Sequence, residues 1–355
     1  MTMPTFQTTR AKVIIPPVGD PAAIRRIIIL CAFLLPAGCR AAADPAPSLS
    51  ATAAMVMPSP MSAASRTPTA TLIPSAVPTP TPTATVFQLP SAVRTTKADV
   101  WDSPANEGSY WHMQTQLILG EKVMVLGREG DWSRIVAVEQ PSHKDPRGYP
   151  GWVRSEFLAE GWPEAEYFAV VMKARTHLYA EMDGMPGMTV YLDTRLPVVT
   201  SWEQWVKVRV PDGSEGWLPF NDVRMTQDLS EVYPTYELFA LAESLAGVPY
   251  KWGGTISDAL DCSGLPYRLF HAFGILMSRD ADDQALEGTF VDRYSVRKGD
   301  LIFAATSSGG KVTHEVIYWG NNTVIDADIV KGVMIRPMSE FFVNYFWITA
   351  RRFLP

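Results

Sequence analysis

Hydrophobic and polar residues alternate along two consecutive stretches in the middle of the chain. The run Lys122–Leu126 is typical of the first stretch, and Leu196–Val199 of the second. Alternation with a period of two places successive side chains on opposite faces of a strand, and the Gly, Pro and Asp residues between the runs are typical of turns. The pattern predicts two small all-β barrels, over residues 97–160 and 161–228.

The periodicity changes after Pro234. Apolar residues recur at helical spacing from Tyr236 to Ala246, and Gly247 follows as a helix cap. Two further helices are expected over residues 265–273 and 280–286. Strands are then expected at Leu301–Ala304, Glu315–Trp319, Thr323–Ala327, Val333–Arg336 and Phe346–Arg351. Helices followed by an antiparallel sheet predict an α+β domain over residues 229–355.

Both barrel segments carry tryptophan at corresponding places. Trp132 and Trp152 lie in the first segment, Trp205 and Trp217 in the second, and Gly-Trp-Val or Gly-Trp-Leu closes each pattern. In this arrangement each segment resembles a bacterial SH3-like domain, and the four tryptophans are expected in the barrel cores. A polar, proline-containing insertion at residues 140–148 is expected to form a surface loop.

The first 39 residues have the layout of an export signal. Arg25 and Arg26 precede a short apolar run, Ile27–Leu35, which is too short to cross a bilayer but fits the apolar part of a signal peptide. Small residues then lead to Cys39, and this site resembles bacterial lipoprotein processing sites, in which the cysteine carries the lipid. We expect an extracytoplasmic protein anchored to the membrane through Cys39, with plain secretion as the alternative.

A proline-rich stretch follows at residues 40–96. It contains ten prolines, many Ala, Ser and Thr residues and few charges. Such a composition cannot bury enough apolar surface to offset the entropy lost on ordering, so a disordered linker is expected. Beyond this linker the only cysteine is Cys262, and no internal disulfide is expected in the mature chain.

Charge and composition exclude several functional classes. The net charge is -6, and no block of Lys and Arg provides the basic surface that nucleic-acid binding requires. The five histidines and the cysteines are scattered, without the spacing of a zinc site. Nucleic acid is therefore not an expected partner, and neither a metal nor another cofactor is expected.

Cys262 is the candidate nucleophile. It lies in Asp261-Cys262-Ser263-Gly264, where a loop enters a predicted helix, so unpaired N–H groups and the helix dipole are expected to lower the pKa of its thiol. His314 begins a strand 52 residues later and is the general-base candidate. His271 is nine residues after Cys262 on the same helix and is expected on the opposite face.

Four ordered blocks carry a family resemblance: Gly247–Gly254, Asp261–Gly264, Arg297–Phe303 and His314–Gly320. They resemble the NlpC/p60 cell-wall cysteine peptidases. With two SH3-like segments in front, the chain resembles the subgroup that cuts peptidoglycan stem peptides. The resemblance implies a papain-like catalytic domain that hydrolyses the bond between γ-D-glutamate and a diamino acid, diaminopimelate or lysine. The fragments implied as substrates carry a free N-terminal L-alanine.

The resemblance also implies roles within the catalytic domain. Asp326 stands twelve residues after His314, where the family commonly has His, and a carboxylate there can accept the Nδ1–H of the imidazole. A solvated strand-end Asp326 is the alternative. Tyr250 matches a tyrosine beside the oxyanion site. Asp261 and Ser263 are implied to hold the substrate's amine, although Asp261 alone fits a helix N-cap.

Two residues of the first barrel complete the implied site. Tyr149 and Glu121 match the tyrosine and the acidic residue that the subgroup directs to the substrate's amine, and ordinary surface roles are the alternative. Pro266 inside the catalytic helix and Glu315 after the histidine depart from the family pattern. They support a rival interpretation, a catalytically weak or inactive wall-binding lipoprotein. An amidase or acyl transferase with the same fold is a second rival.

Overall fold

The computed structural model describes residues 87–355. The predicted signal at 1–39, the lipidation residue Cys39 and the linker up to residue 86 lie outside the described residues. Within residues 87–355, no helix has the length and apolar character needed to cross a bilayer.

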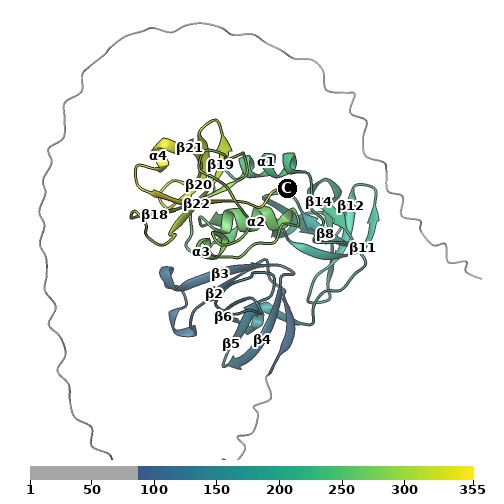
Figure 1. The fold of residues 1–355 in the computed structure, drawn as a ribbon. Coiled ribbons are helices and arrows are strands. Elements are labelled where there is room, and N and C mark those ends of the chain that lie inside the picture. The colour runs from purple at the N-terminus through teal and green to yellow at the C-terminus, as the bar shows by residue number, and fades with distance from the viewer. Residues whose placement is uncertain (1–86) are drawn as a thin grey trace, which may run out of the picture. The chain divides into compact units, whose positions relative to one another are not determined.

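Two seven-stranded barrels occupy the first part of the described chain (Figure 1). Barrel 1 contains β1 Leu89–Val93, β2 Lys97–Trp101, β3 Met113–Ile118, β4 Lys122–Glu129, β5 Trp132–Ala137, β6 Tyr149–Arg154 and β7 Leu158–Glu160. Barrel 2 contains β8 Phe168–Val171, β9 Arg175–Tyr179, β10 Pro186–Tyr191, β11 Arg195–Trp202, β12 Trp205–Arg209, β13 Glu215–Pro219 and β14 Val223–Thr226. Short 3-10 helices lie at Pro104–Asn106, Tyr110–His112, Ser155–Phe157 and Phe220–Asp222.

The two barrels share one topology. The strand order is β3-β2-β6-β5-β4-β1-β7 in barrel 1 and β10-β9-β13-β12-β11-β8-β14 in barrel 2. Adding seven to each strand number of barrel 1 gives the strand order of barrel 2. The repeat predicted from the alternating patterns is therefore confirmed.

Barrel 1 begins earlier than composition indicated. Strand β1 pairs with both β4 and β7, with Ser91 opposite Val123 on one side and Glu160 on the other. The side chains of Ala92 and Val93 are fully buried. The boundary expected at residue 97 was therefore too late. The prolines around β1 make its sequence resemble the linker, although the strand packs into the barrel.

The barrel cores are aliphatic. The core of barrel 1 contains Val93, Ala98, Val100, Leu117, Val123, Val125, Ile135, Ala137, Tyr149 and Val153. Trp132 packs instead in a small separate cluster with Trp101 and Met113, and Trp205 and Trp217 of barrel 2 are half-buried. The expectation of core tryptophans is confirmed for Trp132, which is buried and has Trp152 packed against its cluster, and is wrong for Trp205 and Trp217.

The C-terminal part is an α+β domain. Its helices are α1 Thr235–Ser244, α2 Gly264–Ala272, α3 Ala281–Gln284 and α4 Met338–Phe341. Its main sheet has the order β17-β22-β18-β19-β20-β21, formed by β17 Thr289–Phe290, β18 Leu301–Ala305, β19 His314–Gly320, β20 Thr323–Asp328, β21 Gly332–Pro337 and β22 Phe346–Arg352. A two-stranded sheet pairs β15 Thr255–Ile256 with β16 Ala259–Leu260. The three helices and five strands predicted for this domain are confirmed, whereas α4 and the short strands β15, β16 and β17 were not predicted.

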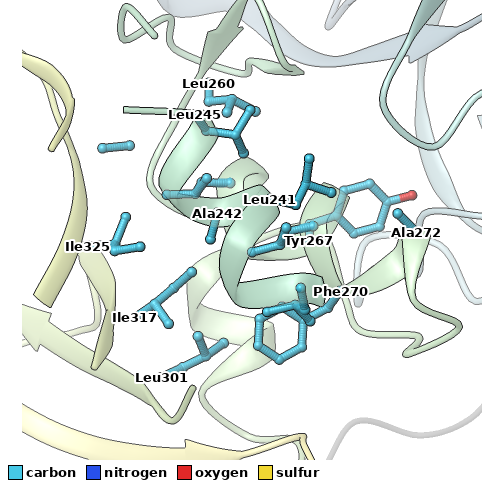
Figure 2. Packing of buried hydrophobic residues seen from close by; sticks show 14 of the residues in the cluster. Leu241, Ala242, Leu245, Leu260, Tyr267, Phe270, Ala272, Leu301, Ile317 and Ile325 are labelled. Carbon is cyan, nitrogen blue, oxygen red and sulfur yellow. The ribbon is translucent and has the colours of Figure 1, made fainter. Parts of the chain in front are cut away.

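Helices α1 and α2 pack together against the main sheet. Figure 2 shows side chains from both helices, Leu241 and Leu245 of α1 and Phe270 of α2, in one group with Ile317 of β19 and Ile325 of β20. These buried side chains form one apolar cluster. Burial of this kind stabilises the domain by about 25 cal/mol per Å² of apolar surface and holds α2 in place against the strand that carries His314.

The start of α2 tolerates the two unusual residues in its first turn. A Cβ at Gly264 would lie 1.9 Å from the carbonyl oxygen of Gly254, so only glycine fits there. Pro266 is the third residue of α2. Its missing N–H falls in the first turn, where a helix has no internal acceptor. Pro266 therefore leaves the helix intact.

Candidate active site

Cys262 lies directly before α2, on the short segment that follows β16. The residue as a whole is partly exposed, whereas its thiol lies among buried neighbouring groups. The backbone N–H of Glu315, the residue after His314, lies close enough to the thiol to favour its thiolate form. Tyr250 is held nearby, since its backbone bridges Leu260 two residues before Cys262. The fold thus brings the predicted nucleophile to the start of β19.

The resting state of Cys262 is a thiol. Burial raises its pKa well above the ordinary value, and the carboxyl groups of Asp261 and Glu315 raise it further. The Arg279 guanidinium and the Glu315 backbone N–H act in the opposite direction but are weaker influences. The prediction of a lowered thiol pKa is therefore wrong for the protein without substrate. A base must take the proton when the sulfur attacks.

His314 is oriented by a buried carboxylate. Its Nε2 lies 2.7 Å from Oδ1 of Asp326, which corrects the expectation that Nδ1 faces this residue. The imidazole stacks on Tyr345, with ring centroids 4.7 Å apart and planes at 15°. Tyr345 also lies close enough to Cys262 for a thiolate there to raise the pKa of its phenol, after burial and Asp326. Tyr345 is a neighbour of both predicted catalytic residues, and the sequence reading missed it.

Asp326 is not a solvated strand-end residue. It is fully buried, and its second oxygen, Oδ2, accepts a hydrogen bond from Nη2 of Arg336. The carboxylate therefore joins the imidazole on one side and a guanidinium on the other. Because Nε2 is engaged by Asp326, Nδ1 is the ring nitrogen without a side-chain partner in the described structure.

Asp261 and Ser263 are held by a buried arginine. Arg279 donates from Nη2 to Oδ2 of Asp261, at 2.7 Å, and from Nη1 to Oγ of Ser263, at 2.8 Å. The other oxygen of Asp261 accepts the N–H of Gly264, at 2.6 Å, and so caps α2. The capping alternative for Asp261 is therefore realised in the structure, and Arg279 is a functional candidate that the sequence reading missed.

Tyr149 of barrel 1 reaches the catalytic domain. Its hydroxyl donates to the carboxylate of Asp280, with distances of 3.0 and 3.1 Å to the two oxygens. The ammonium of Lys144 lies 2.9 Å from the same carboxylate. Burial and the charge of Asp280 raise the pKa of Tyr149, whose phenol therefore stays protonated. Asp280 and Lys144 were not singled out in the sequence, because their partners are distant along the chain.

Glu121 does not join this group. Its Oε2 lies 3.1 Å from Nη2 of Arg268 on α2, and its Oε1 accepts from Gln140 at 2.6 Å. Arg268 also pairs with Asp193 of barrel 2, at 3.0 Å. The expected contact between Glu121 and the substrate's amine is therefore wrong. The residue is buried, both its carboxyl oxygens are engaged, and it connects barrel 1 to the catalytic helix.

Glu315 is an unusual neighbour of the nucleophile. Its side chain is fully buried, and neither carboxyl oxygen has a hydrogen-bond partner in the described structure. Burial raises its pKa well above the ordinary value, and the charge of Asp261 raises it further. The raised pKa favours the protonated, uncharged form of this carboxyl beside the imidazole.

The insertion at residues 140–148 is not a free surface loop. Gln140 is fully buried, and the carbonyl of Pro141 accepts the backbone N–H of Arg279 at 3.0 Å. His143 Nδ1 lies 2.6 Å from Asp283. With Asp282 these two residues form a group whose donor atoms lie within 4.8 Å of one another, which is the arrangement that could hold a metal ion. The loop docks on the catalytic domain because its polar side chains find partners there.

Comparison with known proteins connects this arrangement to a family. The family model described as "NlpC/P60 family" matches residues 247–352, and the model described as "YKFC SH3b2 domain" matches residues 171–225. The chain is 31% identical to a gamma-D-glutamyl-L-lysine dipeptidyl-peptidase of Bacillus cereus, over 74% of this chain and 80% of the relative. It is 32% identical to the Bacillus subtilis protein of the same name, over 60% of this chain and 71% of that relative.

A solved structure extends the likeness to the arrangement of the domains. The crystal structure of an NlpC/P60 family protein from Bacillus cereus aligns with 75% of this chain and all of that chain, at a TM-score of 0.68 and 26% identity. The alignment is long enough to include barrel strands as well as the catalytic domain. The predicted α+β peptidase domain preceded by two SH3-like barrels is confirmed, and the chain belongs to the NlpC/P60 family of peptidoglycan hydrolases.

Proposed function

We propose that this protein is a cysteine endopeptidase that cleaves the bond between γ-D-glutamate and a diamino acid in peptidoglycan stem peptides with a free N-terminal L-alanine. The observation that carries the proposal is the buried His314–Asp326 pair on the strand whose next residue, Glu315, neighbours the thiol of Cys262. A relative with an activity of this kind covers most of the chain.

The reaction follows from the arrangement of the side chains. The sulfur of Cys262 attacks the γ-carbonyl carbon while Nδ1 of His314 takes the thiol proton, and Asp326 stabilises the imidazolium that forms. The hydroxyl of Tyr250, which burial and the nearby Cys262 keep protonated by raising its pKa, donates to the oxyanion. His314 then returns the proton to the leaving amine, and water hydrolyses the thioester.

Recognition of the substrate's amine falls to the barrel 1 side of the site. The carboxylate of Asp280 is 23% exposed and is held by Tyr149 and Lys144. Asp261 and Ser263 flank the sulfur but are engaged by Arg279. An alanine ammonium beside Asp280 would add a charge-assisted hydrogen bond of about 1.5–3 kcal/mol.

The decisive assay uses L-Ala-γ-D-Glu-L-Lys and the matching diaminopimelate peptide. Mass spectrometry is expected to find L-Ala-γ-D-Glu and the free diamino acid from the intact protein, and neither product from Cys262→Ala. Acetylation of the alanine amine is expected to lower kcat/KM at least about 10-fold, because the ammonium contact is lost. A Cys262→Ala variant that retains full hydrolysis would contradict the mechanism.

The wall-binding interpretation has one observation in its favour, the raised pKa of the Cys262 thiol. A binding protein would sediment with purified peptidoglycan and release no product from either peptide. Amidase or acyl-transfer chemistry would give different products in the same mass spectra. The peptide assay therefore separates the three interpretations.

The proposal includes an extracytoplasmic location, with lipid attachment at Cys39. It is supported by the family's cell-wall substrates and by the apolar run before Cys39. The variant Cys39→Ala is expected to move from the membrane fraction to the soluble fraction of expressing bacteria. An unchanged membrane fraction would contradict attachment at Cys39.

A further inference from the structure

A buried line of hydrogen bonds runs from barrel 1 to the two residues that flank the nucleophile. Thr115 of β3 donates to Oε1 of Gln140, at 2.6 Å, and accepts from Nε of Arg279, at 3.0 Å. Arg279 then donates to Ser263 and Asp261, on either side of Cys262. Barrel 1 is thus two hydrogen bonds away from the residues next to the sulfur.

Every member of this line is shielded from water. Thr115 and Gln140 are fully buried, and Arg279 is 1% exposed. A guanidinium is a planar fork of five donors, so an acceptor on Nε fixes where the two terminal nitrogens point. The hydroxyl of Thr115 occupies that position. Without it, Arg279 would keep a buried donor unpaired, which costs about 1–3 kcal/mol.

The contacts of barrel 2 have a different character. Asp193 pairs with Arg268 and His271, which lie further along α2 and not beside the sulfur. Barrel 2 therefore supports the body of the helix. Within residues 87–355, the hydrogen bonds that lead to the residues adjacent to the nucleophile come from barrel 1, through Arg279.

We propose that Thr115, supported by Gln140, is a positioning residue for the peptidase reaction: it fixes Arg279, and through it Asp261 and Ser263 on either side of Cys262. Barrel 1 then supports the catalytic centre through Thr115, in addition to packing against the catalytic domain. This inference rests on the proposed function for its substrate assay and has a second readout that needs no substrate.

The first experiment is a double-mutant cycle in the full chain. Thr115→Val keeps the volume of the side chain but removes the hydroxyl, and kcat/KM for L-Ala-γ-D-Glu-L-Lys is expected to fall about 10- to 100-fold. Thr115→Ser restores the hydroxyl and is expected to recover most of the loss. In an Arg279→Lys background, which lacks the fork, Thr115→Val is expected to have little further effect because both variants remove the same interaction.

The second readout is the alkylation rate of Cys262 by iodoacetamide, followed on the Cys262 peptide by mass spectrometry. Because the Arg279 charge favours the thiolate, Thr115→Val is expected to slow alkylation at pH 7 about 3- to 10-fold, which corresponds to a pKa change of about half a unit to one unit. If the wild type alkylates as expected but releases no product, the proposed function fails while the positioning role remains testable.

A matched control comes from the same barrel. Ser133 is fully buried and its hydroxyl bonds Ser155 at 2.8 Å, so Ser133→Ala removes a buried hydrogen bond away from the site. It is expected to lower the melting temperature without changing either rate. Wild-type kcat/KM and alkylation in a folded Thr115→Val, or an undiminished effect of Thr115→Val in the Arg279→Lys background, would overturn the proposal.

Discussion

The substitution Asp326→Asn tests the catalytic pair through its second partner. Asp326 accepts from Nε2 of His314 on one oxygen and from Arg336 on the other. An asparagine has one oxygen and one NH2 group, and the guanidinium attracts the oxygen. The NH2 group then faces the imidazole and donates to Nε2. This arrangement places the ring proton on Nδ1, where it cannot accept the proton of the Cys262 thiol.

The expected loss follows from what the wrong tautomer removes. Nε2 loses a charge-assisted hydrogen bond of 2.7 Å to a buried carboxylate, which contributes about 1.5–3 kcal/mol, and the base itself is blocked. An amide substitution of this kind in a serine protease triad lowers kcat by about 10,000-fold. We expect a fall in kcat of about 1,000- to 10,000-fold here, or about 4–5.5 kcal/mol, with KM nearly unchanged.

The assay is hydrolysis of L-Ala-γ-D-Glu-L-Lys, with the double variant Asp326→Asn/Arg336→Met as the decisive comparison. Removing the guanidinium lets the amide turn, so that its oxygen again accepts the Nε2 proton, and kcat is expected to recover about 10- to 100-fold, the contribution of one charged hydrogen bond. The reasoning is refuted if Asp326→Asn retains more than a tenth of the wild-type kcat, or if loss of Arg336 brings no recovery.

Three further substitutions have defined outcomes. Burial raises the pKa of Glu315 in the folded protein, whereas the unfolded chain ionises near pH 4.5. Between pH 4.5 and the pKa of Glu315 in the folded protein, the folded state keeps the carboxyl proton that the unfolded state has lost. The wild-type free energy of unfolding should therefore fall by up to about 1.4 kcal/mol per pH unit relative to that of Glu315→Gln. Urea titrations from pH 5 to 8 measure this difference, and the same pH dependence in both proteins would disprove the prediction. Arg268→Met leaves Glu121 buried without its cation and should cost about 3–5 kcal/mol of stability, seen as a lower urea midpoint, and an unchanged midpoint would argue against the ion pair. Tyr250→Phe should lower kcat about 10- to 100-fold at constant KM if its hydroxyl holds the oxyanion, whereas a change confined to KM would point to substrate binding instead.

The sequence predicted the catalytic domain well because its signals are local. Helical spacing located α1 and α2, and the strand that begins at His314 followed from an apolar run. The Asp-Cys-Ser-Gly segment also indicated a loop entering a helix, which the structure has at Cys262. The presence of two similar barrels was predicted as well, since the same alternation occurs twice.

The parts that could not be predicted depend on distant partners. Thr115 and Arg279 are 164 residues apart in the chain, and nothing in either segment indicates the other. Glu121 was assigned to the substrate from the family resemblance, and the sequence shows the charge of its carboxylate but not its burial. The thiol pKa was misjudged for the same reason: the helix start is visible in the sequence, whereas the enclosing side chains and Glu315 are brought there by the fold.

Arg268 makes the catalytic helix depend on both barrels. It anchors the nucleophile's helix to an acid from each barrel, Glu121 and Asp193. Cleavage of the chain between the barrels and the catalytic domain would leave this guanidinium without its counter-ions. The catalytic domain alone is therefore expected to be less stable than it is within the full chain.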